Sequence, residues 1–130
     1  MSPPPTGSSP STDPIIPSAL IIITGDPRVS ARPAEAVRIA AGVGTWKKTA
    51  ITVYLREAAV LALSEYTDEF MDEDNYNRYL PIVGELGRPV YVQQGAPLLA
   101  ELDAPRLPFE AIDDAQLAVL AARQDYVFRF

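Results

Sequence analysis

The apolar run from Ala19 to Thr24 limits the fold more than any other feature of this sequence. The run reads ALIIIT, so a strand made from it would be apolar on both faces. Strands of parallel sheets have this continuous pattern because helices cover both faces, whereas half-solvated strands alternate apolar and polar residues. The run is also far shorter than the roughly 20 residues of a membrane-spanning helix. The sequence therefore predicts a buried strand of a parallel sheet.

Further strand-like segments follow this run, and segments with helical character separate them. They are rich in β-branched and aromatic residues and cover residues 49–55, 89–93, 109–112 and 126–130. Strands joined by helical crossovers run parallel, with helices on both faces. We therefore predict a single α/β domain over residues 18–130, a three-layer α/β/α arrangement with a mostly parallel five-stranded sheet.

Capping and breaking residues mark the expected helices between these strands. Ser30 and Pro33 suit the start of the first helix, which should turn Val43 inward and stop at Gly42 or Gly44. The remaining helical segments are expected over residues 56–63, 75–86, 95–102 and 113–121. Pro81 should either kink the second of these or lie in a first turn, and Asp113 should cap the last.

The first 17 residues differ in composition from the rest of the chain. Residues 1–17 contain six Pro and four Ser, and such a segment buries too little apolar surface to offset the entropy lost on ordering. We interpret residues 1–17 as a disordered tail that precedes the domain.

Composition excludes several classes of function. The chain contains no Cys and no His, which removes disulfides, thiolate nucleophiles, cysteine-ligated metals and the commonest general base. The net charge is −6 and the arginines are scattered, so we expect neither nucleic acid nor a membrane as a partner. The N-terminus lacks a basic region followed by an apolar core, which favours a cytoplasmic protein.

Acidic residues are concentrated between Ser64 and Asp74. This stretch holds six carboxylates in 11 residues, but it lacks the alternating Asp/Asn, central Gly and terminal Glu of a calcium-binding loop. We interpret it as a solvated loop and expect no metal site.

Polar residues that directly follow the expected strands form the candidate site. In parallel α/β sheets, ligands bind at the carboxyl ends of the strands. Asp26 before Pro27 could equally form a turn, and Arg56 with Glu57 could be a surface ion pair. The candidate ligand-binding residues are Thr24, Asp26, Arg28, Arg56, Glu57, Gln93 and Gln94.

Three stretches of the chain resemble the DsrE/TusD-like sulfur-relay superfamily. They are the strand at 19–24 with the helix at 34–41, an aromatic strand end with a charged pair and short helix at 53–61, and a Gly-x-Pro strand at 86–96. The likeness covers roughly residues 19–130. The resemblance implies a small α/β domain, in agreement with the strand pattern.

The resemblance also has implications for chemistry and assembly. Family members assemble into trimers or hexamers, and some pass persulfide sulfur through a Cys just after the third strand. Gln93 matches that position, and a carboxamide has no ionisable nucleophile that could carry a persulfide. The family's Gly in the short helix is matched by Ala58 or Ala59. The implied protein is a member without sulfur-carrier chemistry, comparable to Cys-less subunits that support an active partner.

We consider three hypotheses for function, none of which requires a cofactor. The first is a non-catalytic DsrE-like subunit that acts through assembly, as a homo-oligomer or as a heteromer with a Cys-containing DsrE-like relative. The second is a small-molecule binding module with a polar pocket at the strand ends. The third is an enzyme in which Asp26 and Glu57 act as acid and base, but no neighbour in the sequence indicates a shifted pKa.

Overall fold

The computed structural model describes residues 16–46, 49–102 and 104–130. The tail predicted over residues 1–17 lies outside the described residues, apart from its last two positions. The predicted domain is described from its first strand to its last.

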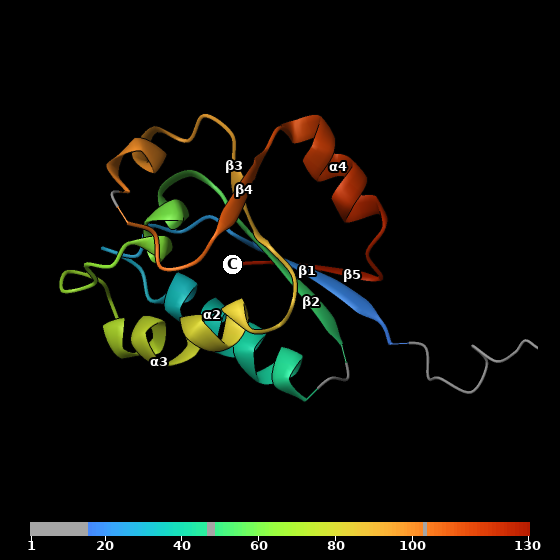
Figure 1. Cartoon of the computed structure of the whole chain (residues 1–130), viewed down its shortest axis with the longest axis horizontal. Coiled ribbons are helices and arrows are strands. Elements are labelled where there is room, and N and C mark those ends of the chain that lie inside the picture. The colour runs from blue at the N-terminus through green and yellow to red at the C-terminus, as the bar shows by residue number, and fades with distance from the viewer. Residues whose placement is uncertain (1–15, 47–48, 103) are drawn as a thin grey trace, which may run out of the picture.

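A parallel sheet of five strands forms the centre of the described chain (Figure 1). Every pair of neighbouring strands is parallel. This confirms the predicted α/β class, and the sheet is parallel throughout rather than mostly parallel. Its strands are β1 (Ser18–Ile23), β2 (Ala50–Leu55), β3 (Val90–Gln93), β4 (Phe109–Ile112) and β5 (Tyr126–Arg129), arranged in the order β4-β3-β2-β1-β5.

Helices cover both faces of the sheet. One face carries α2 (Arg32–Thr45), α3 (Glu73–Gly84) and the 3₁₀ helices η2 (Glu57–Leu63) and η3 (Pro97–Glu101), and the other carries α4 (Asp114–Ala122) (Figure 1). The chain moves outward from β1 to β4 and then returns to the far side of β1. Because crossovers are right-handed, this change of direction places α4 on the opposite face.

The two faces of the sheet have cores of very different size. Alternate residues of β1 point to opposite faces, so Ala19, Ile21 and Ile23 join the large core under α2 and α3. Leu20 and Ile22 instead join a small core under α4. The small core is completed by Tyr54, Ile112, Leu117, Leu120 and Ala121. None of the described helices is long and apolar enough to cross a lipid bilayer.

The first helix extends further than the sequence predicts. It runs through Gly42 and Gly44 and ends at Thr45, and Val43 is exposed rather than turned inward. A Cβ atom at Gly44 would lie 2.6 Å from Leu86 Cδ1. Gly44 therefore serves a close approach between α2 and the segment after α3, not a helix end.

Two other helices differ from the expected pattern. Residues 57–63 form a 3₁₀ helix, and α3 begins at Glu73 and keeps Pro81 in its interior. Proline has no N–H, so α3 forgoes one main-chain hydrogen bond at Pro81. The packing of Tyr76, Leu80 and Val83 into the large core holds the helix together across this position.

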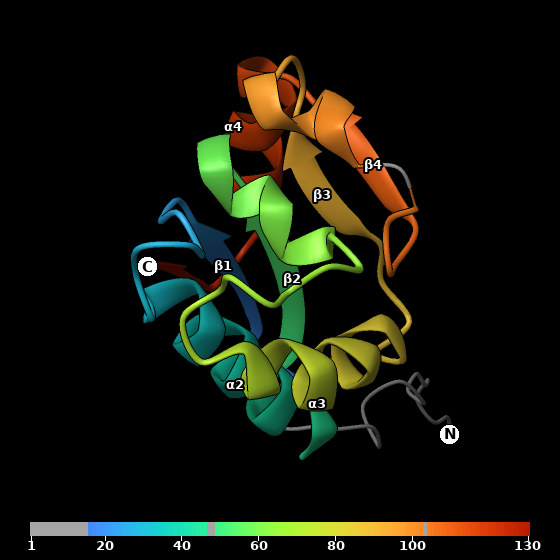
Figure 2. The ribbon, with the colours of Figure 1, turned by 90° about the vertical axis from the view of Figure 1, so that its left-hand side faces the viewer.

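The acidic stretch from Ser64 to Asp74 is an irregular surface segment up to the start of α3. Glu65, Asp68 and Glu69 are exposed, whereas Thr67 is buried and donates a hydrogen bond from Oγ1 to Glu73 at 3.4 Å. In Figure 2, this segment and η2 lie in front of the sheet. The solvated loop predicted from the sequence agrees with these positions.

The C-terminal elements leave much apolar surface exposed. Against the described part of the chain, none of the α4 residues is buried. Val119 is 53% exposed, Tyr126 55% and Phe128 50%. Val127 is exposed as well. Soluble monomers seldom keep such a concentration of apolar side chains in water, and surfaces of this kind mark interaction sites.

Candidate functional site

The predicted residues at the ends of β2 and β3 lie next to each other. Because β2 and β3 are neighbouring strands, Glu57 just after β2 and Gln93 at the end of β3 lie at the same edge of the sheet. The Glu57 backbone N–H donates a hydrogen bond to Gln93 Oε1 at 2.9 Å. The carboxamide of Gln93 therefore orients the chain where β2 passes into η2.

The backbone of Glu57 adopts an uncommon conformation. Its φ angle is +55°, in the left-handed region that residues with a Cβ atom seldom enter. Such conformations cost free energy and are often found at functional sites. The hydrogen bond that the Glu57 N–H donates to Gln93 Oε1 is one of the interactions that hold Glu57 in this conformation.

Arg56 connects the strand end to α4. Its Nη1 atom lies 3.0 Å from Asp114 Oδ1 and 3.3 Å from the hydroxyl of Tyr54. The hydrogen bond to Asp114 raises the pKa of Arg56, and burial raises the pKa of Tyr54. Glu57 Oε2 also lies 3.8 Å from Arg56 Nε, as the alternative interpretation of a surface pair predicts.

Sequence reasoning missed Tyr54 and Asp114 as members of this cluster. Asp113 caps α4, as the sequence predicts, by accepting a hydrogen bond from the Gln116 N–H at 2.8 Å. The position of Asp114 just after β4 is the signal that could have placed it at the same edge of the sheet as Arg56.

Asp26 and Arg28 form a separate local pair. Arg28 Nη2 lies 2.9 Å from Asp26 Oδ2, and the side-chain hydrogen bonds of Arg28 lower the pKa of Asp26. The Asp26 carbonyl also accepts the N–H groups of Val29 and Ser30, so the segment is a turn. Arg28 lines a cavity of about 230 Å³ together with Tyr66, Glu69 and Glu101 rather than with Arg56 or Gln93.

Thr24 and Gln94 are both exposed and bind neighbouring strands through their backbones. The Thr24 N–H donates to the Phe130 carbonyl, and the Gln94 N–H donates to the Ile112 carbonyl, each at 2.9 Å. The predicted site thus consists of a cluster at Arg56, Glu57 and Gln93 and a turn at Asp26 and Arg28.

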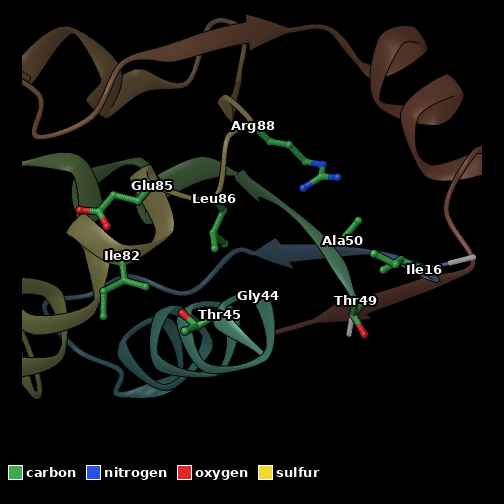
Figure 3. Close-up of a pocket in the computed structure, with 9 residues that line it drawn as sticks. All are labelled: Ile16, Gly44, Thr45, Thr49, Ala50, Ile82, Glu85, Leu86 and Arg88. Carbon is green, nitrogen blue, oxygen red and sulfur yellow. The ribbon is translucent and has the colours of Figure 1, made fainter. Parts of the chain in front are cut away.

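A cavity outside the predicted site lies at the opposite end of the sheet. It has a volume of about 470 Å³ at the beginning of β2 and the ends of α2 and α3, and Figure 3 shows Arg88 extending toward the side of Ala50. No motif in the sequence indicated it, because its walls come from helix ends and loops. The lining residues are Ile16, Gly44, Thr45, Thr49, Ala50, Ile82, Glu85, Leu86 and Arg88.

A second cavity of about 410 Å³ is an apolar groove between α2 and β5, which we call the β5 groove. Tyr126, Phe128 and Phe130 line one side, and Ile39 and Val43 line the other. The groove exists because α2 covers β1 and β2 but leaves β5 exposed.

The described residues contain no group of three or more acidic side chains placed to hold a metal ion. The carboxylates between Ser64 and Asp74 therefore do not converge within the described chain. Asp72 and Glu73 instead stand at the start of α3, where carboxylates interact favourably with the helix dipole.

Comparison with known proteins identifies the fold. Neither a protein-family model nor a protein of curated function matches the sequence. Among solved structures, the crystal structure of the ychN protein from E. coli superposes with a TM-score of 0.73 at 18% sequence identity, covering 88% of this chain and 100% of that chain. The chain therefore shares the α/β fold of YchN.

Proposed function

We propose that this protein is a non-catalytic DsrE-like subunit that acts through assembly, with itself or with a Cys-bearing relative. The observation that carries the proposal is the apolar surface of α4 and β5. The sequence of α4 is DAQLAVLAA, and none of its residues is fully buried against the described chain. Covering such a surface with another subunit removes apolar area from water, which stabilises an assembly.

The absence of sulfur-carrier chemistry rests on the side chains themselves. The chain has no Cys, and the position matched to the family's carrier residue is Gln93, whose Oε1 atom already accepts the Glu57 N–H. A carboxamide engaged in this way serves structure and cannot form a persulfide. The proposed role is therefore that of a supporting subunit.

Assembly should be sensitive to a charge placed on α4. We expect Val119→Asp to weaken association about a hundredfold, because a carboxylate buried without a partner is strongly unfavourable. Light scattering coupled to size exclusion measures this shift toward monomer. Val29→Asp is the matched control, because Val29 is 76% exposed in the turn after β1. If Val119→Asp associates as strongly as the wild-type protein, α4 is not part of the interface.

Native mass spectrometry of protein purified gently from its host identifies the partner. A complex with a Cys-containing relative supports the heteromeric form of the proposal, and a homo-oligomer supports self-assembly. A monomer both in the isolated protein and in the protein purified from its host would contradict the proposed function.

A small-molecule binding module is a second candidate, favoured by the conformation of Glu57. The φ angle of Glu57 is positive. Beside it, Arg56 contacts Tyr54 and Asp114, and these side chains form a polar cluster at the carboxyl ends of β2 and β3. Ligands of parallel α/β domains bind at this end of the sheet.

Retention of a ligand tests the binding module. We expect a reproducible additional mass on each subunit that Arg56→Ala removes. The control is Arg88→Ala, which alters the cavity at the other end of the sheet. If Arg88→Ala rather than Arg56→Ala removes the additional mass, the ligand lies in that cavity. If the wild-type protein carries no additional mass, it is not a binding module.

A further inference from the structure

We propose that two copies of this chain pair through their β5 strands, antiparallel about a two-fold axis at Val127, so that the sheet continues from one copy into the other. This inference rests on the proposed function of assembly. It adds the surface, the symmetry and the identity of the partner, which is a second copy.

The outer edge of β5 offers free main-chain groups. Among the residues that the structure describes, β5 has a neighbouring strand on one side only. Phe130 directs both its groups to β1, since its N–H donates to the Ile22 carbonyl at 2.8 Å and its carbonyl accepts the Thr24 N–H at 2.9 Å. Because these directions alternate along a parallel strand, the N–H and C=O of Val127 point away from the sheet.

The second outward-facing residue of β5 is Arg129. Its carbonyl accepts a long hydrogen bond of 3.4 Å from Arg32 Nη2. Alternation directs the Arg129 N–H to the outer edge, where an added strand would meet it. The edge carries neither Pro nor Lys, two residue types that protect edge strands from pairing.

The sequence of this edge is complementary to itself. Residues 125–129 read DYVFR, so antiparallel pairing centred on Val127 places Asp125 opposite Arg129 of the other copy, twice by symmetry. The same register places Tyr126 opposite Phe128. Opposite charges and aromatic pairs directly across antiparallel strands are stabilising, and an isologous contact requires this self-complementarity.

Both faces of the strand have apolar groups available for burial. Tyr126 and Phe128 stack on each other with ring centroids 6.2 Å apart, on the wall of the β5 groove. Val127 is exposed on the other face. In the Val127-centred register, the aromatic pairs of both copies would meet on one face and the two Val127 side chains on the other. Any assembly built on this contact contains an even number of chains.

Charge variants test the register. Arg129→Asp and Asp125→Arg each place like charges opposite one another, and we expect either variant alone to weaken self-association about tenfold or more. An equimolar mixture restores both opposite-charge pairs and should regain wild-type association. The control is Arg78→Asp, which makes the same charge change at an exposed position of α3, away from α4 and β5.

Asp125 accepts a hydrogen bond from the Ser18 N–H at 2.7 Å and donates its own N–H to the Ser18 carbonyl at 3.0 Å. It therefore offers no N–H to the outer edge, and its replacement also disturbs the attachment of β5 to β1. Val127→Pro provides an independent variant, because the N–H that it removes points to the outer edge, a position where edge strands tolerate proline. Circular dichroism should show an unchanged fold, and light scattering should show the same loss of association.

The absence of Cys in the chain allows a direct proximity test. Directly opposite residues of a hydrogen-bonded antiparallel pair have Cα atoms about 5.5 Å apart, within disulfide range. We expect oxidised Val127→Cys to give covalent dimers at least about tenfold faster than the exposed control Val29→Cys.

The outcomes separate this inference from the proposed function. If the protein is an oligomer whose association the β5 variants do not change and which does not cross-link at position 127, the β5 pairing is wrong. Assembly would then use another surface, and the proposed function would stand. A wild-type monomer in isolation and in its host overturns both. Loss of association in the single variants, recovery in the mixture and cross-linking at position 127 together support the pairing.

Discussion

Tyr54→Ala should lower the free energy of unfolding by about 4 kcal/mol, in the range measured when a buried aromatic side chain is removed. Tyr54 has no exposed surface and lies in the small core that supports α4. Little else joins α4 to the sheet, because only Leu117, Leu120 and Ala121 of α4 pack against this core. The cavity left by the ring would therefore reduce the attachment of α4 as well as the packing of β2.

Urea denaturation followed by circular dichroism measures this effect at a protein concentration where both variants have the same oligomeric state. Tyr54→Phe is the matched control, since it keeps the ring and removes the hydroxyl that lies 3.3 Å from Arg56 Nη1. We expect a loss of about 1 kcal/mol for Tyr54→Phe. Equal losses for the two variants would show that the polar contact, not the ring, supports α4.

Ala40→Leu should destabilise the protein by about 2 to 3 kcal/mol through overpacking. Ala40 is fully buried on α2, along with Ala34, Ala36 and Ala41. These small side chains let α2 pack closely against both the sheet and α3. A larger side chain at Ala40 would force α2 away from one of these neighbours.

Gly42→Ala is the control for this prediction, because it lies in the same helix and a Cβ atom there would meet no other atom within 4 Å. We expect it to raise the free energy of unfolding by about 0.5 to 1 kcal/mol, through the higher helix propensity of Ala. Thermal unfolding of both variants provides the comparison. A tolerated Ala40→Leu would indicate that α2 can shift without cost.

The strands could be predicted from the sequence because their apolar, β-branched runs are local features. The helical segments were less predictable in detail. Gly42 and Gly44 indicate a helix end locally, yet Gly44 lies inside the helix against the Leu86 side chain, which a Cβ atom at this position would displace. Pro81 likewise stays within α3 because tertiary packing outweighs the lost hydrogen bond. Contacts between residues distant in the sequence determine where these helices end, and local helix propensity carries no information about such contacts.

The candidate site was predictable to the extent that strand order brings residues together. Glu57 and Gln93 meet because β2 and β3 are neighbours. Asp26 and Arg28 bind each other within their own turn, which the spacing alone could not distinguish from a shared pocket. Leu117 and Leu120 of α4 pack against the small core, whereas Val119 is exposed. A helix that is apolar on all sides has no periodicity that marks its buried face.

The pairing of β1 with β5 has a consequence for synthesis on the ribosome. The first strand of the described sheet pairs with the last, and the Ser18 N–H binds a carboxylate 107 residues later in the chain. During translation, β1 can acquire β2 as a neighbour early, but its other side stays open until residues 126–129 have left the exit tunnel. Until that point, the edge of β1 that faces β5 keeps its main-chain N–H and C=O groups unpaired and accessible to other strands.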